Sequence, residues 1–146
     1  MKAQIIDSKL THEIRGRILW PHIKDGNYSM AVDNQPNTFH IGTFLQNKII
    51  SVGTFIKTSN PKFQYKLQYR LRAMATDNNY QAKGAGKMLF LKGLEILKNK
   101  KIELLWCDAR INAIPFYQSL NMKSLDGVYM IKNIGMHKTM YIHLNK

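Results

Sequence analysis

The stretch LRAMATDNNYQAKGAG, residues 71–86, joins an apolar–polar alternation to a glycine-containing loop. Residues 64–76 alternate between apolar and polar side chains, which is the pattern of a half-buried strand. The alternation slips at Met74-Ala75, as it does where a β-bulge interrupts a strand. After the loop, residues 85–99 carry the wide apolar face of a helix. The stretch therefore predicts a bulged strand, a loop and a helix in succession.

The loop from Gln81 to Gly86 has features that suit phosphate binding. Glycines let the backbone approach a ligand closely, and the N–H groups and dipole of a following helix favour an anion. The same glycines also suit a plain turn between a strand and a helix. Two common phosphate loops are excluded: Met88 stands where a Walker A loop needs Ser or Thr, and Leu89 where a dinucleotide fingerprint needs Gly.

The rest of the chain predicts further elements on both sides of this stretch. They are a helix capped by Ser8 or Thr11 and ending near Trp20-Pro21, an irregular segment at 22–37, strands at 38–45 and 49–57 joined by a turn, a buried strand at 102–107, a helix at 109–120, and strands at 122–125 and 136–144. The short apolar start of the chain receives no element. The strand–helix–strand unit in the second half predicts a parallel pair inside a mixed sheet, so the expected fold class is α/β (α+β).

Length and composition describe an ordinary globular protein. The chain of 146 residues fits one domain, residues 1–146, which can bury a core without disulfides or a metal. It contains neither a recognisable signal peptide nor an apolar run near the ~20 residues that a membrane helix needs. The single Cys107 excludes an internal disulfide and suits a reducing compartment. We therefore expect a cytoplasmic protein with no membrane association.

The formal net charge of +13 permits several interpretations. Clustered cations can neutralise the phosphates of a nucleic acid, but here they are scattered along the chain. The densest group, Lys98 to Lys101, falls where a helix should end, and cations there complement the helix dipole. The pattern favours a solvated, lysine-rich surface. A few of these cations would also attract a small polyanionic ligand.

Two blocks of the sequence resemble the GNAT superfamily of N-acetyltransferases. In the first, residues 81–86 match the acetyl-CoA motif of the family, which is Gln or Arg, two residues, Gly, any residue, then Gly or Ala. The second block, residues 105–122, is similar to the family's strand, Asn-bearing helix start and Phe-Tyr pair. The run Ile134-Gly135-Met136-His137 looks like the end of a bacterial subgroup of the family. The resemblance covers roughly residues 38–144.

The resemblance implies a three-layer fold, in which a mixed central sheet contains a splayed parallel strand pair and has helices on both faces. Acetyl-CoA would enter between the splayed strands, and backbone groups of the bulged strand would pair with its pantetheine arm. A backbone N–H there would also stabilise charge on the thioester oxygen. Taken alone, Asn112 would equally suit a helix cap. The cofactor contacts implied by the resemblance are Met74, Ala75, Thr76, Gln81, Ala82, Lys83, Gly84, Ala85, Gly86, Lys87, Asn112 and Tyr117.

The resemblance also gives Tyr117 a catalytic role, as the general acid that protonates the departing thiolate. A phenol with a reference pKa near ~10 holds its proton at neutral pH and is suited to donate it. Without the resemblance, Tyr117 is better interpreted as a core aromatic beside Phe116. Transfer in this family goes directly from cofactor to acceptor, so Cys107 is not needed as a nucleophile, and in an apolar strand it suits packing.

The acceptor is expected to be an amine of a small molecule or of a protein. Arg72 lies in the polar phase of its strand beside the cofactor, and we expect it to meet an acidic part of the acceptor, with His40 or His137. The candidates for the base that deprotonates the amine are His40, His137, Asp77 and Asp108. Each of these four also suits a structural or surface role.

Two alternatives come from other classes of protein. One is a protein of the same fold that binds coenzyme A without catalysis, which the presence of Tyr117 and Asn112 disfavours. The other is a basic nucleic-acid-binding protein. The lack of a basic helix interleaved with stacking aromatics argues against it, so no nucleic-acid partner is expected. A homodimer through the C-terminal strands is compatible with the sequence.

Overall fold

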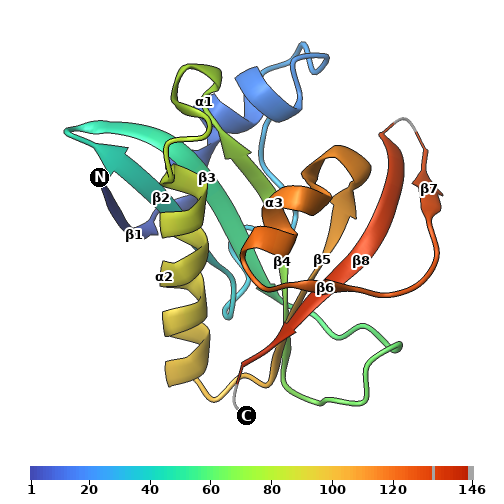
Figure 1. The fold of residues 1–146 in the computed structure, drawn as a ribbon. Helices are drawn as coiled ribbons and strands as arrows, with labels where there is room; N and C mark the ends of the chain where they lie inside the picture. Colours follow the sequence, from blue (N-terminus) through green and yellow to red (C-terminus); the bar gives the residue numbers. More distant parts are fainter. Residues whose placement is uncertain (133, 145–146) are drawn as a thin grey trace.

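An open mixed sheet forms the centre of the computed structural model, which describes residues 1–132 and 134–144 (Figure 1). Its strands are β1 Lys2–Ile6, β2 Phe39–Leu45, β3 Lys48–Lys57, β4 Gln68–Thr76, β5 Leu104–Arg110, β6 Lys123–Ser124, β7 Tyr129–Ile131 and β8 Gly135–His143. They lie in the order β1-β2-β3-β4-β5-β8-β6, and β7 also pairs with β8. Among the described strands, neighbours are antiparallel except β4 and β5, which run parallel.

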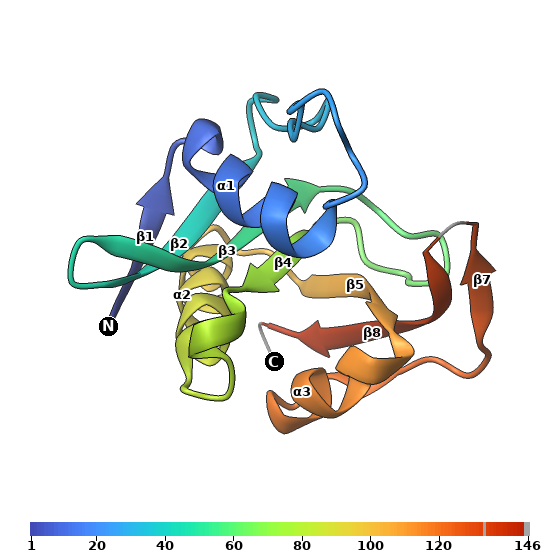
Figure 2. The same cartoon turned by 90° about the horizontal axis from the view of Figure 1, so that it is seen from above.

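Helices cover both faces of the sheet. Their bounds are η1 Ser8–Thr11, α1 His12–Ile14, η2 Arg15–Leu19, η3 Asn78–Tyr80, α2 Ala85–Asn99, η4 Ile111–Ala113 and α3 Ile114–Ser119. Seen from above, the N-terminal helices lie on one side of the sheet, and α2 and α3 lie on the other (Figure 2). A large hydrophobic cluster fills the α2 and α3 side, and a smaller one lies under the N-terminal helices. The predicted α/β fold with three layers is confirmed.

Helix α2 anchors the larger core through one apolar face. Leu89, Phe90 and Leu97 on this face have no exposed surface. Gly93 permits the close approach of the helix to β3, because a Cβ there would lie 2.2 Å from Cζ of Phe55. The helix starts after Gly84, which has a left-handed φ of 90°. Its N-terminus is thereby held at the edge of the sheet where β4 ends.

Strand β4 contains a bulge and then leaves its parallel neighbour. Val52 pairs with Ala75 and Thr54 pairs with Arg72, so two residues of β4 stand opposite the single Gly53. One of them, Ala73, has a left-handed φ of 52°. The pairing of β4 with β5 covers only Gln68 to Arg70, opposite Leu104 to Trp106. Beyond these residues the two strands diverge, and we call the opening between them the wedge.

The N-terminal region differs most from its prediction. The helical stretch ends at Leu19, before Pro21 as predicted, but it passes from a 3-10 turn through one α-helical turn to a π-helical turn. Its cap is Asp7 and neither Ser8 nor Thr11, because the Asp7 carboxylate accepts the hydrogen bond of the Lys9 N–H. Strand β1 precedes it without having been predicted, since only Ile6 of this edge strand is buried.

Several strands and helices in the second half of the chain also begin or end at other residues than predicted. Strand β4 begins at Gln68 and not at residue 64, and Tyr65 and Leu67 of the intervening loop are exposed. Strand β5 extends to Arg110, so the predicted helix at 109–120 becomes the short η4 and α3. The three-residue β7 was not predicted. In contrast, α2 begins and ends at the predicted residues.

Within residues 1–132 and 134–144, the helices are all too short or too polar to cross a membrane.

Candidate active site at the wedge

A large cavity of about 680 Å³ opens between the end of β4, the loop before α2, and α3. Its lining comes from three separate stretches of the chain: residues 18–19, 74–87 and 112–119. Lys83 does not line it, and the Lys83 ammonium instead lies 5.8 Å from the centre of the Tyr80 ring. The predicted cofactor residues that line the cavity are Met74, Ala75, Thr76, Gln81, Ala82, Gly84, Ala85, Gly86, Lys87, Asn112 and Tyr117.

The loop before α2 is shaped by left-handed backbone at two positions, Ala82 with a φ of 61° and Gly84 with a φ of 90°. The Gln81 side chain holds the loop by donating to the Thr76 carbonyl at 3.3 Å and to Asn78 Oδ1 at 3.0 Å. The first N–H groups of α2 have no acceptor within the helix and face this end of the cavity. Such an arrangement favours an anionic group.

Gly86 leaves space in the cavity because it has no side chain. A Cβ on Gly86 would lie 3.1 Å from both Met74 Cε and Phe116 Cζ. The Asn112 side chain lines the same cavity and makes no hydrogen bond with any described residue. It is therefore not a helix cap, and its amide is left for a ligand. A flexible phosphopantetheine arm with phosphates at its end suits these features.

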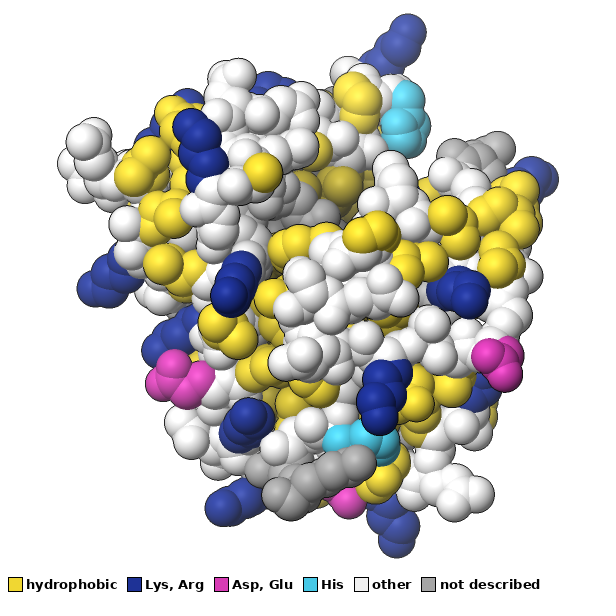
Figure 3. All heavy atoms as spheres, viewed as in Figure 1, with side chains coloured by type: hydrophobic (Ala, Val, Ile, Leu, Met, Phe, Trp, Pro, Cys, Tyr) yellow, Lys and Arg dark blue, Asp and Glu magenta, His cyan; other side chains and the backbone are white. Residues whose placement is uncertain are grey.

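Three lysines lie at or near the end of this cavity that contains Tyr80. Lys48 and Lys83 lie over the Tyr80 ring at 5.1 Å and 5.8 Å, and Lys87 lines the cavity. Elsewhere on the face in Figure 3 the Lys and Arg side chains are spread out and do not gather into one stripe. The local cations near Tyr80 thus complement a small polyanion.

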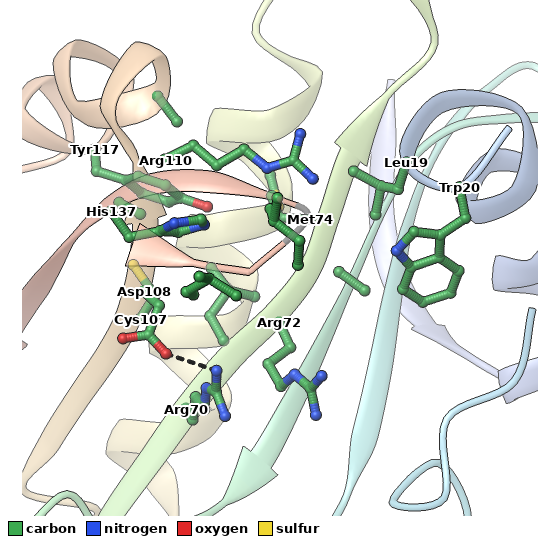
Figure 4. A pocket seen from close by; sticks show the side chains of 16 residues that line it. Leu19, Trp20, Arg70, Arg72, Met74, Cys107, Asp108, Arg110, Tyr117 and His137 are labelled. Carbon is green, nitrogen blue, oxygen red and sulfur yellow. Dashed lines mark hydrogen bonds and ion pairs between the residues drawn. The ribbon is translucent and has the colours of Figure 1, made fainter. Parts of the chain in front are cut away.

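A smaller cavity of about 230 Å³ adjoins the large one on the other side of the wedge (Figure 4). Four residues line both cavities: Leu19, Met74, Ala113 and Tyr117. Reactants held in the two cavities can therefore meet beside the Tyr117 side chain.

Tyr117 is buried, with 7% of its surface exposed, and it lines both cavities. Phe116 and Phe90 pack against its ring at 5.1 Å and 6.4 Å between centroids. Its hydroxyl forms no hydrogen bond with any described residue. Burial, with a smaller contribution from nearby Cys107, raises the pKa of Tyr117 well above its usual value. The phenol is therefore protonated at neutral pH and free to donate.

His137 lines the small cavity and has 3% of its surface exposed. Its Nδ1 lies 2.8 Å from the carbonyl oxygen of Gly135, and because a carbonyl only accepts, Nδ1 carries the proton. In the neutral ring, Nε2 then keeps a lone pair. Tyr129 stacks on the ring at 6.1 Å between centroids, which fixes its plane. The cavity thus contains one oriented proton acceptor, drawn beside Tyr117 in Figure 4.

Asp108 also lines the small cavity, but both of its carboxylate oxygens are occupied. Oδ2 accepts a hydrogen bond from Arg70 at 2.6 Å, and Oδ1 accepts one from the Tyr129 hydroxyl. Burial, and then the hydrogen bond to Asp108, raise the pKa of Tyr129 to about 12, so this hydroxyl remains a donor. Asp108 is therefore a restrained carboxylate that organises its neighbours.

Three arginines line the small cavity together with Asp108: Arg70, Arg72 and Arg110. The guanidinium of Arg70 lies 5.0 Å from the centre of the Trp106 ring, and its Nε is buried without a hydrogen-bond partner in the described chain. Arg72 forms neither a hydrogen bond nor a salt bridge with any described residue. Burial, assisted by the charges of Arg70 and Arg15, lowers the pKa of Arg72.

His40 lies outside both cavities, which corrects the expectation that it meets the acceptor. Its Nδ1 is 2.8 Å from Thr54 Oγ1, and its Nε2 is 3.0 Å from the Asp33 carbonyl oxygen. Arg15 completes this buried network: it pairs with the Asp33 carboxylate at 2.8 Å and donates to Thr54 Oγ1 at 2.8 Å. With both ring nitrogens engaged, His40 has a structural role. The network holds η2 on the sheet.

Asp77, another candidate base, also lies outside the two cavities. Its carboxylate accepts hydrogen bonds from Arg17 at 2.9 Å and from the Asn79 N–H at 2.9 Å. These two bonds lower the pKa of Asp77. The side chain caps η3 and ties it to η2 through Arg17.

Some cavity residues were missed by the sequence analysis. Leu19 and Trp20 at the end of η2 line the small cavity, and no local pattern marks them. Arg70 shares the polar phase of the β4 alternation with Arg72, so the alternation could have identified it. Cys107 reaches the cavity wall, but burial raises the pKa of its thiol to about 12, which agrees with a packing role.

Comparisons with known proteins agree with this geometry. Residues 9–122 match the family model described as "Acetyltransferase (GNAT) family". A Bacillus subtilis (strain 168) protein named "Uncharacterized N-acetyltransferase YitI" is 33% identical over 141 residues, which cover 97% of this chain and 95% of that protein.

Solved structures show the same fold at low sequence identity. An aminoglycoside 6'-N-acetyltransferase complexed with coenzyme A is 13% identical and has a TM-score of 0.79, covering 100% of this chain and 98% of that one. The ribosomal-protein-S18-alanine N-acetyltransferase from Escherichia coli is 17% identical, with a TM-score of 0.71 and coverage of 99% and 94%.

Proposed function

Because the chain belongs to the GNAT family of acetyltransferases, we propose that its reaction takes place where the two cavities meet, beside Tyr117. The protein is an N-acetyltransferase that uses acetyl-CoA and an amine acceptor, in agreement with the resemblance. Acetyl-CoA supplies the acetyl group as a reactive thioester. Transfer goes directly to the amine, so no covalent enzyme intermediate forms.

The large cavity is the proposed cofactor site. The N–H groups at the start of α2 and the loop from Gln81 to Lys87 would bind the diphosphate, with Lys87 adding positive charge. Met74 and Thr76 lie beyond the β4–β5 pairing, so their backbone groups would bind the pantetheine arm. Asn112 would hydrogen-bond the same arm.

Tyr117 is the proposed general acid. Its raised pKa keeps the proton on the phenol, and its unpaired hydroxyl stands between the two cavities. His137 is the proposed base, because its Nε2 is the unengaged acceptor and its Nδ1 is held by Gly135. Asp77 and His40 lie elsewhere, and Asp108 is occupied by Arg70.

A variant series tests the proposed base. In His137→Gln, we expect kcat/KM for the amine to fall while the thermal shift with acetyl-CoA stays the same. The Asp108→Asn variant should keep more of the activity. If Asp108→Asn loses the larger share of kcat/KM, Asp108 is the base.

Cellular location and assembly belong to this proposal. The described chain keeps its cysteine as a buried free thiol, Cys107, which favours the reducing cytoplasm. A homodimer through the C-terminal strands stays a prediction, and light scattering at several protein concentrations will test it.

The observation that carries the proposed site is the shared lining of the two cavities at Met74 and Tyr117. It is tested by thermal unfolding with acetyl-CoA, coenzyme A, ATP and NAD. A ligand that binds only the folded state raises the apparent unfolding temperature, and we expect this for the first two alone. The absence of any shift with acetyl-CoA and coenzyme A would refute the cofactor site. Thiol release over a panel of amines then measures transfer.

A further inference from the structure

We infer that the acceptor is a small amine carrying an anionic group, a carboxylate or a phosphate, which the Arg72 guanidinium binds. This inference rests on the proposed function, because it assigns the small cavity to the acceptor. It concerns what the cavity recognises and is independent of which residue acts as base.

The Arg72 guanidinium lines one wall of the small cavity without an acceptor. It has no hydrogen bond or salt bridge with any described residue. Arg72 takes no part in the ion pair of Arg70 and Asp108, which Figure 4 marks with a dashed line. A partly buried cation without a partner is costly, and an anionic ligand relieves this cost.

The charges around Arg72 favour an anion over a cation. Arg70 and Arg15 oppose its positive charge, and their effect exceeds that of Asp108 and Asp33. Asp33 is already paired with Arg15, and Asp108 with Arg70. Arg72 is thus a partly buried cation without an ion-pair partner among the described residues, and its planar fork suits a bidentate carboxylate or phosphate.

The remaining walls limit the acceptor in size and character. The cavity volume of about 230 Å³ is below the range of sites for drug-sized ligands, roughly 300–1,000 Å³. Leu19, Trp20, Ile131 and Ile134 give it apolar sides. The acceptor is therefore compact, and its anion lies on the β4 side while its amine reaches Tyr117.

Matched pairs of amines test the inference. Each pair differs only in the anion: an apolar α-amino acid against its amide, and O-phosphoethanolamine against ethanolamine, with spermidine as a polycation. Both kcat/KM from thiol release and binding to the coenzyme A complex by calorimetry are measured. We expect the anionic member to be favoured about 10- to 100-fold, as for a charge-assisted hydrogen bond. Whichever pair shows the preference identifies the anion as carboxylate or phosphate.

Variants assign the preference to one residue. Arg72→Gln should abolish it while leaving the thermal shift with acetyl-CoA intact, and Arg72→Lys should keep part of it. Lys66→Gln, an exposed charge removal in the loop before β4, is the control and should retain it.

Three outcomes would overturn the inference: equal binding and turnover of both members of every pair, preference for spermidine, or an anion preference unchanged in Arg72→Gln. Because binding is measured alongside turnover, the inference stays decidable when no amine in the panel is acetylated. Failure of the cofactor site itself appears separately, as loss of the acetyl-CoA shift in the wild type.

Discussion

The two cavities beside Tyr117 are lined by different kinds of residues. More than half of the residues that line the large cavity, among them the small residues Ala75, Gly84 and Gly86, come from the single stretch 74–87. The small cavity is lined by charged and bulky side chains, such as Arg72 and Trp20, from η2, β4, β5 and the β7–β8 region. A site made of backbone groups suits a ligand that stays the same, such as a cofactor. The specificity of a site made of side chains can be changed by single substitutions.

Because of this difference, we expect the large and the small cavity to respond differently to mutation. Substitutions in the large cavity should act through steric blocking, because its N–H groups cannot be removed by changing a side chain. Substitutions in the small cavity should act through charge and shape. Tyr117 lines both cavities, so removing its hydroxyl alone should affect the chemistry while the ring keeps its contacts in both.

The largest effect is expected for Tyr117→Phe. Removing the hydroxyl removes the proton donor, so kcat should fall about 100- to 10,000-fold. The ring and its packing on Phe116 and Phe90 remain, so acetyl-CoA affinity by calorimetry should stay the same. The exposed Tyr65→Phe serves as the control. A Tyr117→Phe enzyme with wild-type kcat would show that another group protonates the thiolate.

Next in size is the effect of Asp33→Asn on stability. The variant leaves the buried Arg15 guanidinium without its partner, which should lower the free energy of unfolding by about 3–5 kcal/mol in urea titrations. The exposed pair of Glu13 and Arg17 gives a control, because Glu13→Gln should cost less than about 1 kcal/mol. Because the network holds η2, and the end of η2 lines both cavities, Asp33→Asn should also raise KM for the amine and for acetyl-CoA.

The same carboxylate predicts a pH dependence. Burial of Asp33 alone would raise its pKa, but the hydrogen bonds from Arg15 and from the Met30 N–H outweigh it, and the pKa is lowered. Since the unfolded carboxylate takes up its proton first, the contribution of Asp33 is present above about pH 4 and lost as pH falls through the folded pKa. Wild-type stability should therefore decline below about pH 4, and Asp33→Asn should decline less steeply.

A smaller effect is expected for Gly86→Val, which tests steric blocking in the large cavity. Its Cβ would press on Met74 and Phe116, and overpacking costs roughly 1–3 kcal/mol, so acetyl-CoA should bind about 10-fold more weakly or worse. Leu91→Val on the exposed face of α2 introduces the same side chain without this effect. Amine selectivity, measured as the ratio of kcat/KM within a pair, should not change.

The smallest effect concerns Cys107. Because burial raises the pKa of its thiol to about 12, Ellman's reagent should not label the folded protein at pH 8 and should label it fully in guanidinium. Cys107→Ala should cost about 1 kcal/mol of stability and leave kcat nearly unchanged. A large loss of kcat would give the thiol a role that its position in β5 does not suggest.

The same contrast explains what could be predicted from the sequence. The large cavity follows from residues that are neighbours along the chain: the slip at Met74, the loop to Gly86 and the helix after it. The alternation of β4 and the apolar run of β5 likewise reveal the parallel pair. Local patterns suffice where local backbone builds the site.

The small cavity could not be predicted in the same way. Arg15, Asp33 and Thr54 come from three segments, and no local pattern shows that they form one buried network, so His40 could not be recognised as part of it. Trp20 enters the cavity because η2 is held by that network. Strand β7 depends on pairing with β8, and three residues carry too little pattern to reveal it.

The bulge in β4 depends on one extra residue, so the deletion of a single codon would remove it. Deleting Ala73 would place Met74 opposite Gly53 and leave both flanking pairs, Val52 with Ala75 and Thr54 with Arg72, in register. The strained left-handed residue would be lost, and β4 could continue straight along β5. The shortened chain would have a more regular sheet and would lose the opening proposed for the cofactor, so selection for cofactor binding would act against the most regular form of this strand.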